Sequence, residues 1–226
     1  SDLVALRVFD DRGAGYEEWV EQALSWVHEH QFAFENPITT VNLSLGGMWN
    51  GDSPPNWATL EDELSQLHAA GIFVSVAAGN AFQDYLAPGL SYPAVSEYVV
   101  PVSSTDSAGK MSDFSQRHAR AIAAPGQAIT STVPGHMFGS GTGAGAFAAA
   151  SGTSMAAPYI AGASVLVRQA LELVGTSEVS EDWVYHHLRQ TGDEVFDPVT
   201  GALYHRVDLA AALDALMPED DHGDSP

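Results

Sequence analysis

One serine in this chain stands in a setting that could support nucleophilic catalysis. Ser154 lies in the run ASGTSMAAP (residues 150–158), where a glycine-rich loop passes into a predicted helix. The small neighbours would let a reacting carbonyl group approach the hydroxyl, and the amide end of the helix favours negative charge that develops beside it. The alternative is that Ser154 only caps the helix, as most serines before apolar helices do.

A second polar group that could act on a carbonyl oxygen is Asn80. It follows Gly79 and the apolar run IFVSVA (residues 72–77), which predicts a buried strand. Its side-chain amide could donate a hydrogen bond to an oxyanion. Taken alone, an asparagine after a strand is more simply a turn residue with left-handed backbone, so both interpretations stay open.

The elements that must position these side chains alternate between strands and helices. Apolar β-rich runs predict strands at residues 3–9, 40–45, 72–77, 98–102 and 128–133. Helical spacing of apolar residues predicts helices at residues 16–30, 60–70, 154–173, 181–190 and 207–216. This alternation predicts a parallel sheet with helices on both faces, in which ligands bind beyond the carboxyl ends of the strands.

The composition excludes several classes of function. The 226 residues include 29 acidic and 8 basic residues, for a formal net charge of −21, and Lys110 is the one lysine. The electrostatic field of a chain with this negative charge repels nucleic acids and anionic membranes, which disfavours them as partners. The absence of cysteine excludes disulfides, thiolate metal sites and thiol catalysis. Such a surface suits high salt, although acidic surfaces also occur without halophily.

Targeting and membrane segments are not predicted in this sequence. Residues 1–7 lack the basic start and the long apolar stretch of a signal peptide. Residues 121–167 carry no charged side chain, but prolines and glycines interrupt them too often for a membrane span. An uncharged stretch in so charged a chain is expected to be buried or to line a cleft.

Five motifs, in order, resemble those of the subtilisin-like serine proteases (subtilases). They are VNLSLGG (residues 41–47), AAGN (77–80), APG (124–126), ASGTSMAAP (150–158) and RVDLAAAL (206–213). The resemblance covers residues 3–216 and implies an α/β, three-layer fold: a mostly parallel sheet with helices on both faces, lacking its first strands. It implies a partial peptidase domain over residues 1–217, followed by an acidic mobile tail over residues 218–226.

By this resemblance Ser154 is the nucleophile of a serine endopeptidase, and Asn80 and the Ser154 backbone amide bind the oxyanion. An extended peptide substrate would lie between two backbone edges and place one side chain in a specificity pocket. The implied edges are Gly13, Ala14 and Gly15 on one side and Ser44, Leu45 and Gly46 on the other, and the implied pocket walls are Ala77, Ala78, Gly79 and Ser91. Because these walls are small and uncharged, we predict a large apolar side chain before the scissile bond.

The base and its orienting carboxylate are not found in this sequence. In the subtilisin order both precede the serine, with the histidine roughly 157 residues before it. Ser154 has 153 residues before it, so both would fall at or before residue 1. The nine histidines of this chain are predicted to be surface or structural residues, and His136, in the loop before Ser154, is the least implausible substitute.

Three hypotheses follow from that absence. The first is that the functional protein is longer, that this chain is its carboxy-terminal portion, and that the chain alone is practically inactive. The second is a non-catalytic peptide-binding pseudoprotease or a degenerate remnant. The third is an acid-acting serine peptidase of the sedolisin type, which Asn80 argues against because those relatives carry Asp at the oxyanion position.

The resemblance also sets expectations for cofactors, location and assembly. It implies no cofactor in this chain and leaves calcium binding to the full-length protein, because the family's main calcium ligands come mostly from the missing portion. It implies an extracellular protein that acts as a monomer on peptides or proteins.

Overall fold

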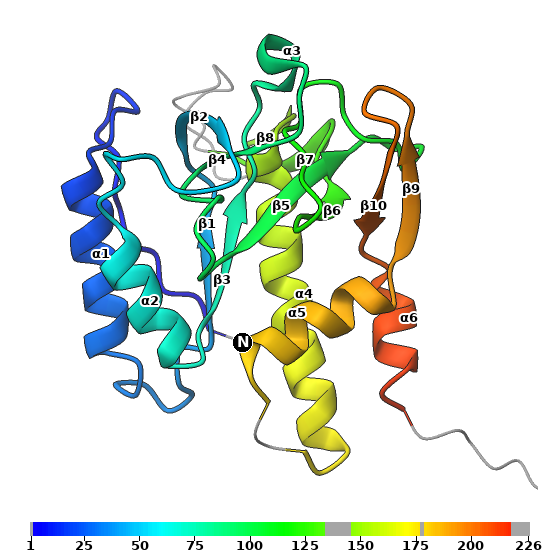
Figure 1. The fold of residues 1–226 in the computed structure, drawn as a ribbon. Coiled ribbons are helices and arrows are strands. Elements are labelled where there is room, and N and C mark those ends of the chain that lie inside the picture. Colours follow the sequence, from blue (N-terminus) through cyan, green and yellow to red (C-terminus); the bar gives the residue numbers. More distant parts are fainter. Residues whose placement is uncertain (1, 134–145, 177–178, 218–226) are drawn as a thin grey trace, which may run out of the picture.

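The central feature of the computed structural model is a six-stranded sheet (Figure 1). The structure describes residues 2–133, 146–176 and 179–217. The strands follow the order β1 (Thr40–Leu43), β3 (Phe73–Ala77), β5 (Val100–Thr105), β6 (Ile122–Pro125), β10 (Ala202–Arg206) and β9 (Asp193–Asp197). Neighbours pair in parallel except β10 and β9, which pair antiparallel. The prediction of an α/β protein with a mostly parallel sheet is confirmed.

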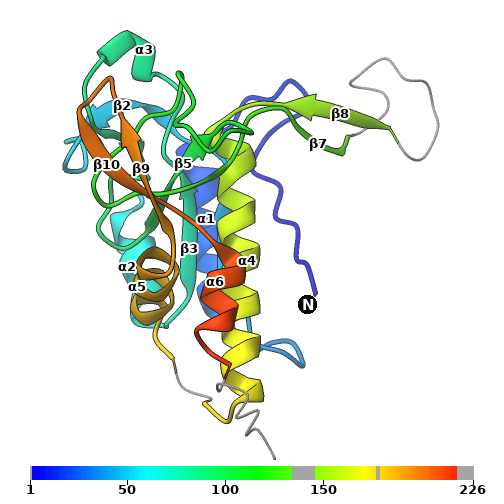
Figure 2. The same cartoon turned by 90° about the vertical axis from the view of Figure 1, so that its right-hand side faces the viewer.

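Helices and two smaller sheets surround this central sheet. The helices are α1 (Glu17–Glu29), α2 (Glu61–Ala69), α3 (Phe82–Tyr85), α4 (Thr153–Leu173), α5 (Glu181–Gln190) and α6 (Leu209–Asp214). One small sheet pairs β2 (Gly47–Gly51) with β4 (Leu90–Tyr92), and the other pairs β7 (Ile129–Thr132) with β8 (Phe147–Ala150). Figure 2 shows that the β7–β8 hairpin extends away from the body of the molecule.

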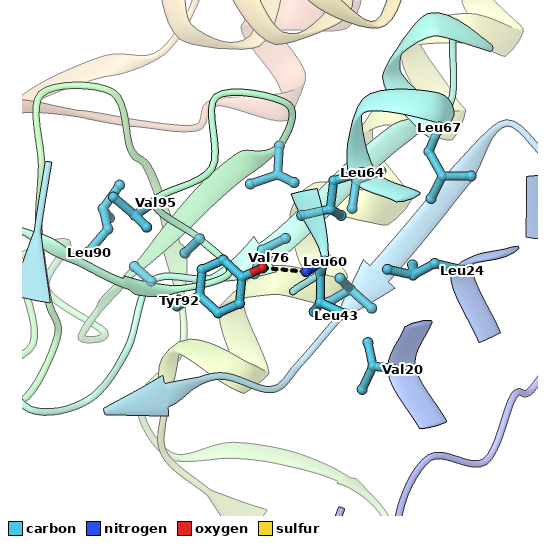
Figure 3. Packing of buried hydrophobic residues seen from close by; sticks show 14 of the residues in the cluster. Val20, Leu24, Leu43, Leu60, Leu64, Leu67, Val76, Leu90, Tyr92 and Val95 are labelled. Carbon is cyan, nitrogen blue, oxygen red and sulfur yellow. Dashed lines mark hydrogen bonds between the residues drawn. The ribbon is translucent and has the colours of Figure 1, made fainter. Parts of the chain in front are cut away.

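Side-chain alternation along β3 divides the interior into two cores. Val74 and Val76 join a cluster with buried leucines and valines of α1 and α2 (Figure 3). Phe73 and Ala77 join a second cluster with α4, α5 and α6. Because successive residues of a strand point to opposite faces, one continuous apolar run supplies both cores. The sheet is therefore covered on both faces, as predicted.

Helix α4 lies against four strands and determines where Ser154 lies. Its buried side is made of small and branched apolar residues, including Ala156, Ile160 and Val167. The small residues allow the helix to approach the sheet closely, and buried Ser75 of β3 donates a hydrogen bond from its hydroxyl to Ala157 O at 2.8 Å. Contact between α4 and the sheet thus explains part of the uncharged stretch at residues 121–167, whereas β7 and β8, in the same stretch, are mostly exposed.

A buried ion pair joins the sheet edge to the loop after β5. Arg117 is 1% exposed and Asp197 is 4% exposed, and Arg117 Nη1 donates to Asp197 Oδ2 at 2.8 Å. The guanidinium also donates to Ser115 O and Ser112 O and lies 3.6 Å from the centroid of the Phe82 ring. Burial acts to raise the pKa of Asp197, but hydrogen bonds from Thr200 and Arg117 outweigh it and leave this pKa lowered.

The strand predicted at residues 3–9 does not form. The segment is not hydrogen-bonded into the sheet, and Leu3, Val4, Leu6 and Phe9 are all exposed. Among the described residues, β3 is the one strand that pairs with β1, so the other edge of β1 is open. A strand needs a neighbour to satisfy its backbone groups, and residues 3–9 have none here.

Several other sequence predictions were incomplete. The run at residues 128–133 does form β7, but in a hairpin with β8 rather than in the central sheet. The β9–β10 hairpin was not predicted. The proposed tail at residues 218–226 and His136 lie outside the described residues. Among the described helices, none is both long and apolar enough to cross a membrane.

Candidate active site

Ser154 is the second residue of α4 and is half-buried at the carboxyl ends of the parallel strands. Its Oγ donates to Ser44 O at 3.1 Å, and Ser44 Oγ donates to Ser154 O at 2.8 Å. Since the first residues of a helix lack intrahelical acceptors for their N–H groups, the Ser154 amide can donate to a ligand. The capping alternative is wrong: Gly152, and not Ser154, is the N-cap residue of α4.

The hydrogen bond from Ser44 Oγ to Ser154 O is made possible by Pro158. In a helix the N–H at position 158 would donate to the carbonyl oxygen at position 154, but proline has no N–H. The Ser154 carbonyl is therefore free to accept from the Ser44 hydroxyl, which in turn accepts from Asn42 Nδ2 at 3.0 Å. This contact fastens the end of β1 to the first turn of α4.

Asn80 lies beside Ser154 with a defined orientation. Its Oδ1 accepts from the Thr153 backbone amide at 2.9 Å and from Thr153 Oγ1 at 3.0 Å. Because a backbone amide can only donate, the oxygen must face Thr153 and the amide nitrogen must face away. None of the described residues accepts a hydrogen bond from Asn80 Nδ2. The side chain thus presents an amide donor next to the first turn of α4, which the simple turn interpretation does not explain.

Two glycines permit the close packing of the loops around this site. Gly79 has φ +109°, and a Cβ there would lie 2.0 Å from Gln116 Oε1. Gly126 packs so tightly that a Cβ would lie 2.8 Å from Gly152 O, and Gly152 N donates to Gly126 O at 2.8 Å. Larger residues at either position would displace the loops that carry Asn80 and Ser154.

Gln116 and Thr153 were not assigned roles from the sequence. Gln116 N donates to Gly79 O at 2.9 Å, and its side-chain Nε2 donates to Trp49 O and to Asn50 Oδ1. Gly79 N donates to Thr153 Oγ1 at 3.2 Å. Thr153 belongs to the motif ASGTSMAAP (residues 150–158), so its place next to Ser154 was a signal that it could have a role at this site. Gln116 lies in no motif, and nothing in the sequence distinguished it.

The two segments predicted as pocket walls lie against each other. Ala77, Ala78 and Ser91 are buried, Ser91 N donates to Ala78 O at 2.8 Å, and Ser91 Oγ donates to Ala77 O at 3.3 Å. Burial raises the pKa of the neighbouring Tyr92 to about 12, so this phenol is neutral near pH 7. The walls are uncharged, as the sequence indicated.

The residues predicted to bind the substrate backbone are accessible. Gly13, Ala14, Gly15, Ser44 and Gly46 are exposed, and Leu45 is half-buried. Gly15 lies close to residues 8 and 9, and Gly46 lies close to Ser91 and Tyr92. Two surface hollows, of about 370 and 480 Å³, lie elsewhere, and neither is lined by Ser154 or Asn80.

No histidine among the described residues hydrogen-bonds to Ser154. Several are engaged elsewhere: His118 with Asp52, His68 with Glu181, and His187 with Ala212 O. Burial lowers the pKa of His118 despite the neighbouring Asp52 carboxylate, which acts to raise it. Among the described residues, no histidine or other base is therefore in hydrogen-bond contact with the Ser154 hydroxyl.

The sequence matches a known family over most of its length. The profile described as "Subtilase family" matches residues 1–202. Subtilisin of Bacillus pumilus is 32% identical over 168 residues, which is 74% of this chain and 54% of that protein. An intracellular serine protease of Paenibacillus polymyxa is 30% identical over 190 residues, 83% of this chain and 52% of that protein. The chain spans about half the length of these curated relatives.

Solved structures share the fold. The prenylagaramide maturation protease PagA superimposes with a TM-score of 0.73 at 21% identity, covering 93% of this chain and 71% of that one. A protease from Pseudoalteromonas arctica superimposes with a TM-score of 0.68 at 24% identity, covering 90% of this chain and 60% of that one.

Proposed function

This chain belongs to the subtilase family of serine proteases, and we propose that it supplies the nucleophile and the oxyanion donors of a serine endopeptidase. The observation that carries the proposal is the arrangement of Ser154 and Asn80. The Asn80 side chain is held against Thr153, the residue before Ser154, and neither its amide nitrogen nor the Ser154 N–H has an acceptor among the described residues.

In the proposed reaction, Ser154 Oγ attacks the scissile carbonyl carbon and loses its proton to a base. The carbonyl oxygen becomes an oxyanion that accepts from Asn80 Nδ2 and the Ser154 amide. The tetrahedral intermediate collapses, the amine leaves with the proton, and an acyl-enzyme on Ser154 remains. Water then releases the acid and restores the hydroxyl.

The hydroxyl must first give up its contact with Ser44 O. An extended substrate that adds its backbone to the edge at residues 44–46 would donate an N–H to this carbonyl. Substrate binding would thus release the Ser154 proton from Ser44 O and make the hydroxyl available to the base.

We propose that the base and its carboxylate come from an N-terminal portion of the same domain that this sequence does not include. Two observations support this: no described histidine hydrogen-bonds to Ser154, and among the described residues one edge of β1 has no paired strand. The alternative is a peptide-binding domain that keeps the cleft without catalysis. In the catalytic case calcium binding would also belong to the longer protein.

Intact mass and the amino-terminal peptide of the protein from its native source test this proposal. We expect a mass well above 23.9 kDa and an upstream aspartate and histidine. The purified 226-residue chain should show only the small residual catalysis of a site without base, about a thousand- to ten-thousand-fold over water. Casein cleavage by that chain at an ordinary protease rate would contradict the proposal, whereas a native mass of 23.9 kDa would favour the peptide-binding alternative.

The uncharged walls at residues 77–79 and 91–93 support a preference for a large apolar side chain before the scissile bond. We expect kcat/KM of the complete protein to be higher for phenylalanine or leucine than for lysine or glutamate at that position. A panel of peptides that differ only there measures it. Faster cleavage after lysine or glutamate would show that other groups form the pocket.

An extracellular location and a monomeric state are further proposals from the family. An intracellular serine protease is among the similar proteins, so the family alone does not decide the location. Activity measured in the culture medium and in washed cells distinguishes the two locations, and size-exclusion chromatography with light scattering measures the oligomeric state.

A further inference from the structure

A cluster of three metal-ligating side chains lies at the end of α2, outside the candidate active site. His68 in the last turn of α2 faces Glu181 and Asp182 in the first turn of α5. One ligand atom from each side chain lies within 4.8 Å of the other two. Because the two carboxylates lie 113 and 114 positions after the imidazole in the sequence, tertiary packing of two helices creates the cluster.

The geometry and ligand chemistry suit a transition-metal ion. His68 Nδ1 lies 3.1 Å from Glu181 Oε1, and two ligand atoms bound to one tetrahedral zinc lie about 3.3 Å apart. An imidazole with two carboxylates is a ligand set that zinc accepts, whereas magnesium and calcium favour oxygen ligands alone. We propose that His68, Glu181 and Asp182 bind a divalent transition-metal ion of the zinc type, with solvent as the fourth ligand.

The surroundings hold the ligands in place before metal binds. Arg168 of α4 donates to Gly71 O at 3.0 Å and to Val179 O at 2.9 Å, which fastens the residues just after α2 to those just before α5. Glu181 and His68 are only partly exposed, and the His68 ring lies 5.8 Å from that of Tyr98. The two carboxylates carry two negative charges and Arg168 carries one positive charge, so the net charge near the cluster favours a cation. Metal binding would therefore join α2 to α5 and stabilise the contact between the two cores.

Zinc binding can be measured without protease activity. The complete native protein is prepared with Ser154→Ala, which prevents autolysis, and calcium is kept saturating so that a calcium site elsewhere cannot respond. Calorimetric titration with ZnCl₂ should show one tight site per chain. When free zinc exceeds Kd a hundredfold, Tm should rise by about 5 to 10 °C.

Two variants and one control assign the response to this cluster. His68→Gln and Asp182→Asn should each abolish the tight site and most of the rise in Tm; Asp182 is exposed, so its variant is expected to fold. His28→Gln, on the exposed side of α1, should leave both unchanged. Equal zinc responses in the wild-type, His68→Gln and Asp182→Asn proteins would overturn the proposal, as would an equal response to magnesium, because either would indicate non-selective binding to surface carboxylates.

Discussion

At the scale of single residues, Pro158 shows how a missing N–H shapes a site four positions away. The carbonyl that it leaves free accepts a hydrogen bond from Ser44, and this bond connects the end of β1 to the first turn of α4. A residue that would disrupt an ordinary helix here creates the attachment point for one edge of the proposed cleft.

A double-mutant cycle tests this connection. We expect Ser44→Ala to lower the free energy of unfolding by about 1 to 2 kcal/mol, because the hydroxyl that donates to Ser154 O and accepts from Asn42 Nδ2 is lost. In a Pro158→Ala background the helix can satisfy the Ser154 carbonyl itself, so the same change should cost less. Urea unfolding of the four proteins measures the difference, and equal costs in both backgrounds would show that Pro158 and Ser44 act independently.

Asn80 combines two roles that one substitution can separate. Asn80→Asp keeps an oxygen that accepts from the Thr153 amide, but it removes the donor and adds a negative charge near the oxyanion. We expect kcat of the complete protein to fall at least about a hundred- to a thousand-fold, the range known for oxyanion donors from subtilisin itself. Tm should change little, whereas Asn80→Ala should lower both kcat and Tm. Retained activity in Asn80→Asp would contradict the proposed donor.

The buried ion pair of Arg117 and Asp197 can be compared with an exposed ion pair, Arg206 and Asp193, which serves as its control. We expect Asp197→Ala to destabilise the protein by about 3 to 5 kcal/mol at pH 7, because it leaves a buried charge unpaired. Asp193→Ala removes the partner of Arg206, a pair with side chains 49% and 34% exposed, and should cost about 1 kcal/mol or less. Urea unfolding measures both, and similar costs would refute this ranking.

The difference in the free energy of unfolding between the wild-type and Asp197→Ala proteins should depend on pH in one direction. The pKa of Asp197 is lowered in the folded protein, so its stabilising contribution is complete above its unfolded pKa of about 4. The contribution is lost as pH falls through the folded pKa. The difference between the wild-type and Asp197→Ala proteins should therefore be constant near neutral pH and shrink below about pH 4.

At the scale of elements, local patterns predicted the helices better than the strands. The spacing of apolar residues correctly predicted α1, α2, α4 and α5, because one face of each packs against the sheet or another helix. The run at residues 3–9 is mostly apolar, as β3 is, but it does not form a strand. Pairing partners decide strands, and local sequence does not carry that information.

For the candidate site, the sequence indicated the residues in the motifs but not the residues that support them. The motifs indicated Ser154 and Asn80 because glycines and small residues mark places where loops must pack closely. They did not indicate Gln116, whose backbone N–H donates to Gly79 O and whose side chain donates to Trp49 and Asn50 of β2. Such supporting contacts depend on the tertiary fold, and any of several polar residues could make them.

At the scale of the whole molecule, the charge of −21 opposes folding through mutual repulsion of carboxylates. Raising NaCl from 0.1 to 1 M shortens the screening length from about 10 to about 3 Å, so the free energy of unfolding should rise. Urea unfolding at several salt concentrations measures the slope. A Glu18→Gln, Glu29→Gln variant, with two fewer exposed charges, should show a smaller slope, and a flat response in the wild type would argue against a salt-adapted surface.

The open edge of β1 has a consequence for how the 226-residue chain behaves in concentrated solution. Unpaired backbone groups on an edge strand can recruit the same edge of another molecule, and only long-range repulsion between acidic surfaces keeps two copies apart. The salt that strengthens the fold also removes this repulsion. Colloidal stability of the folded chain should therefore fall as the salt concentration rises, and preparations of the chain should turn turbid at high salt while each molecule remains folded.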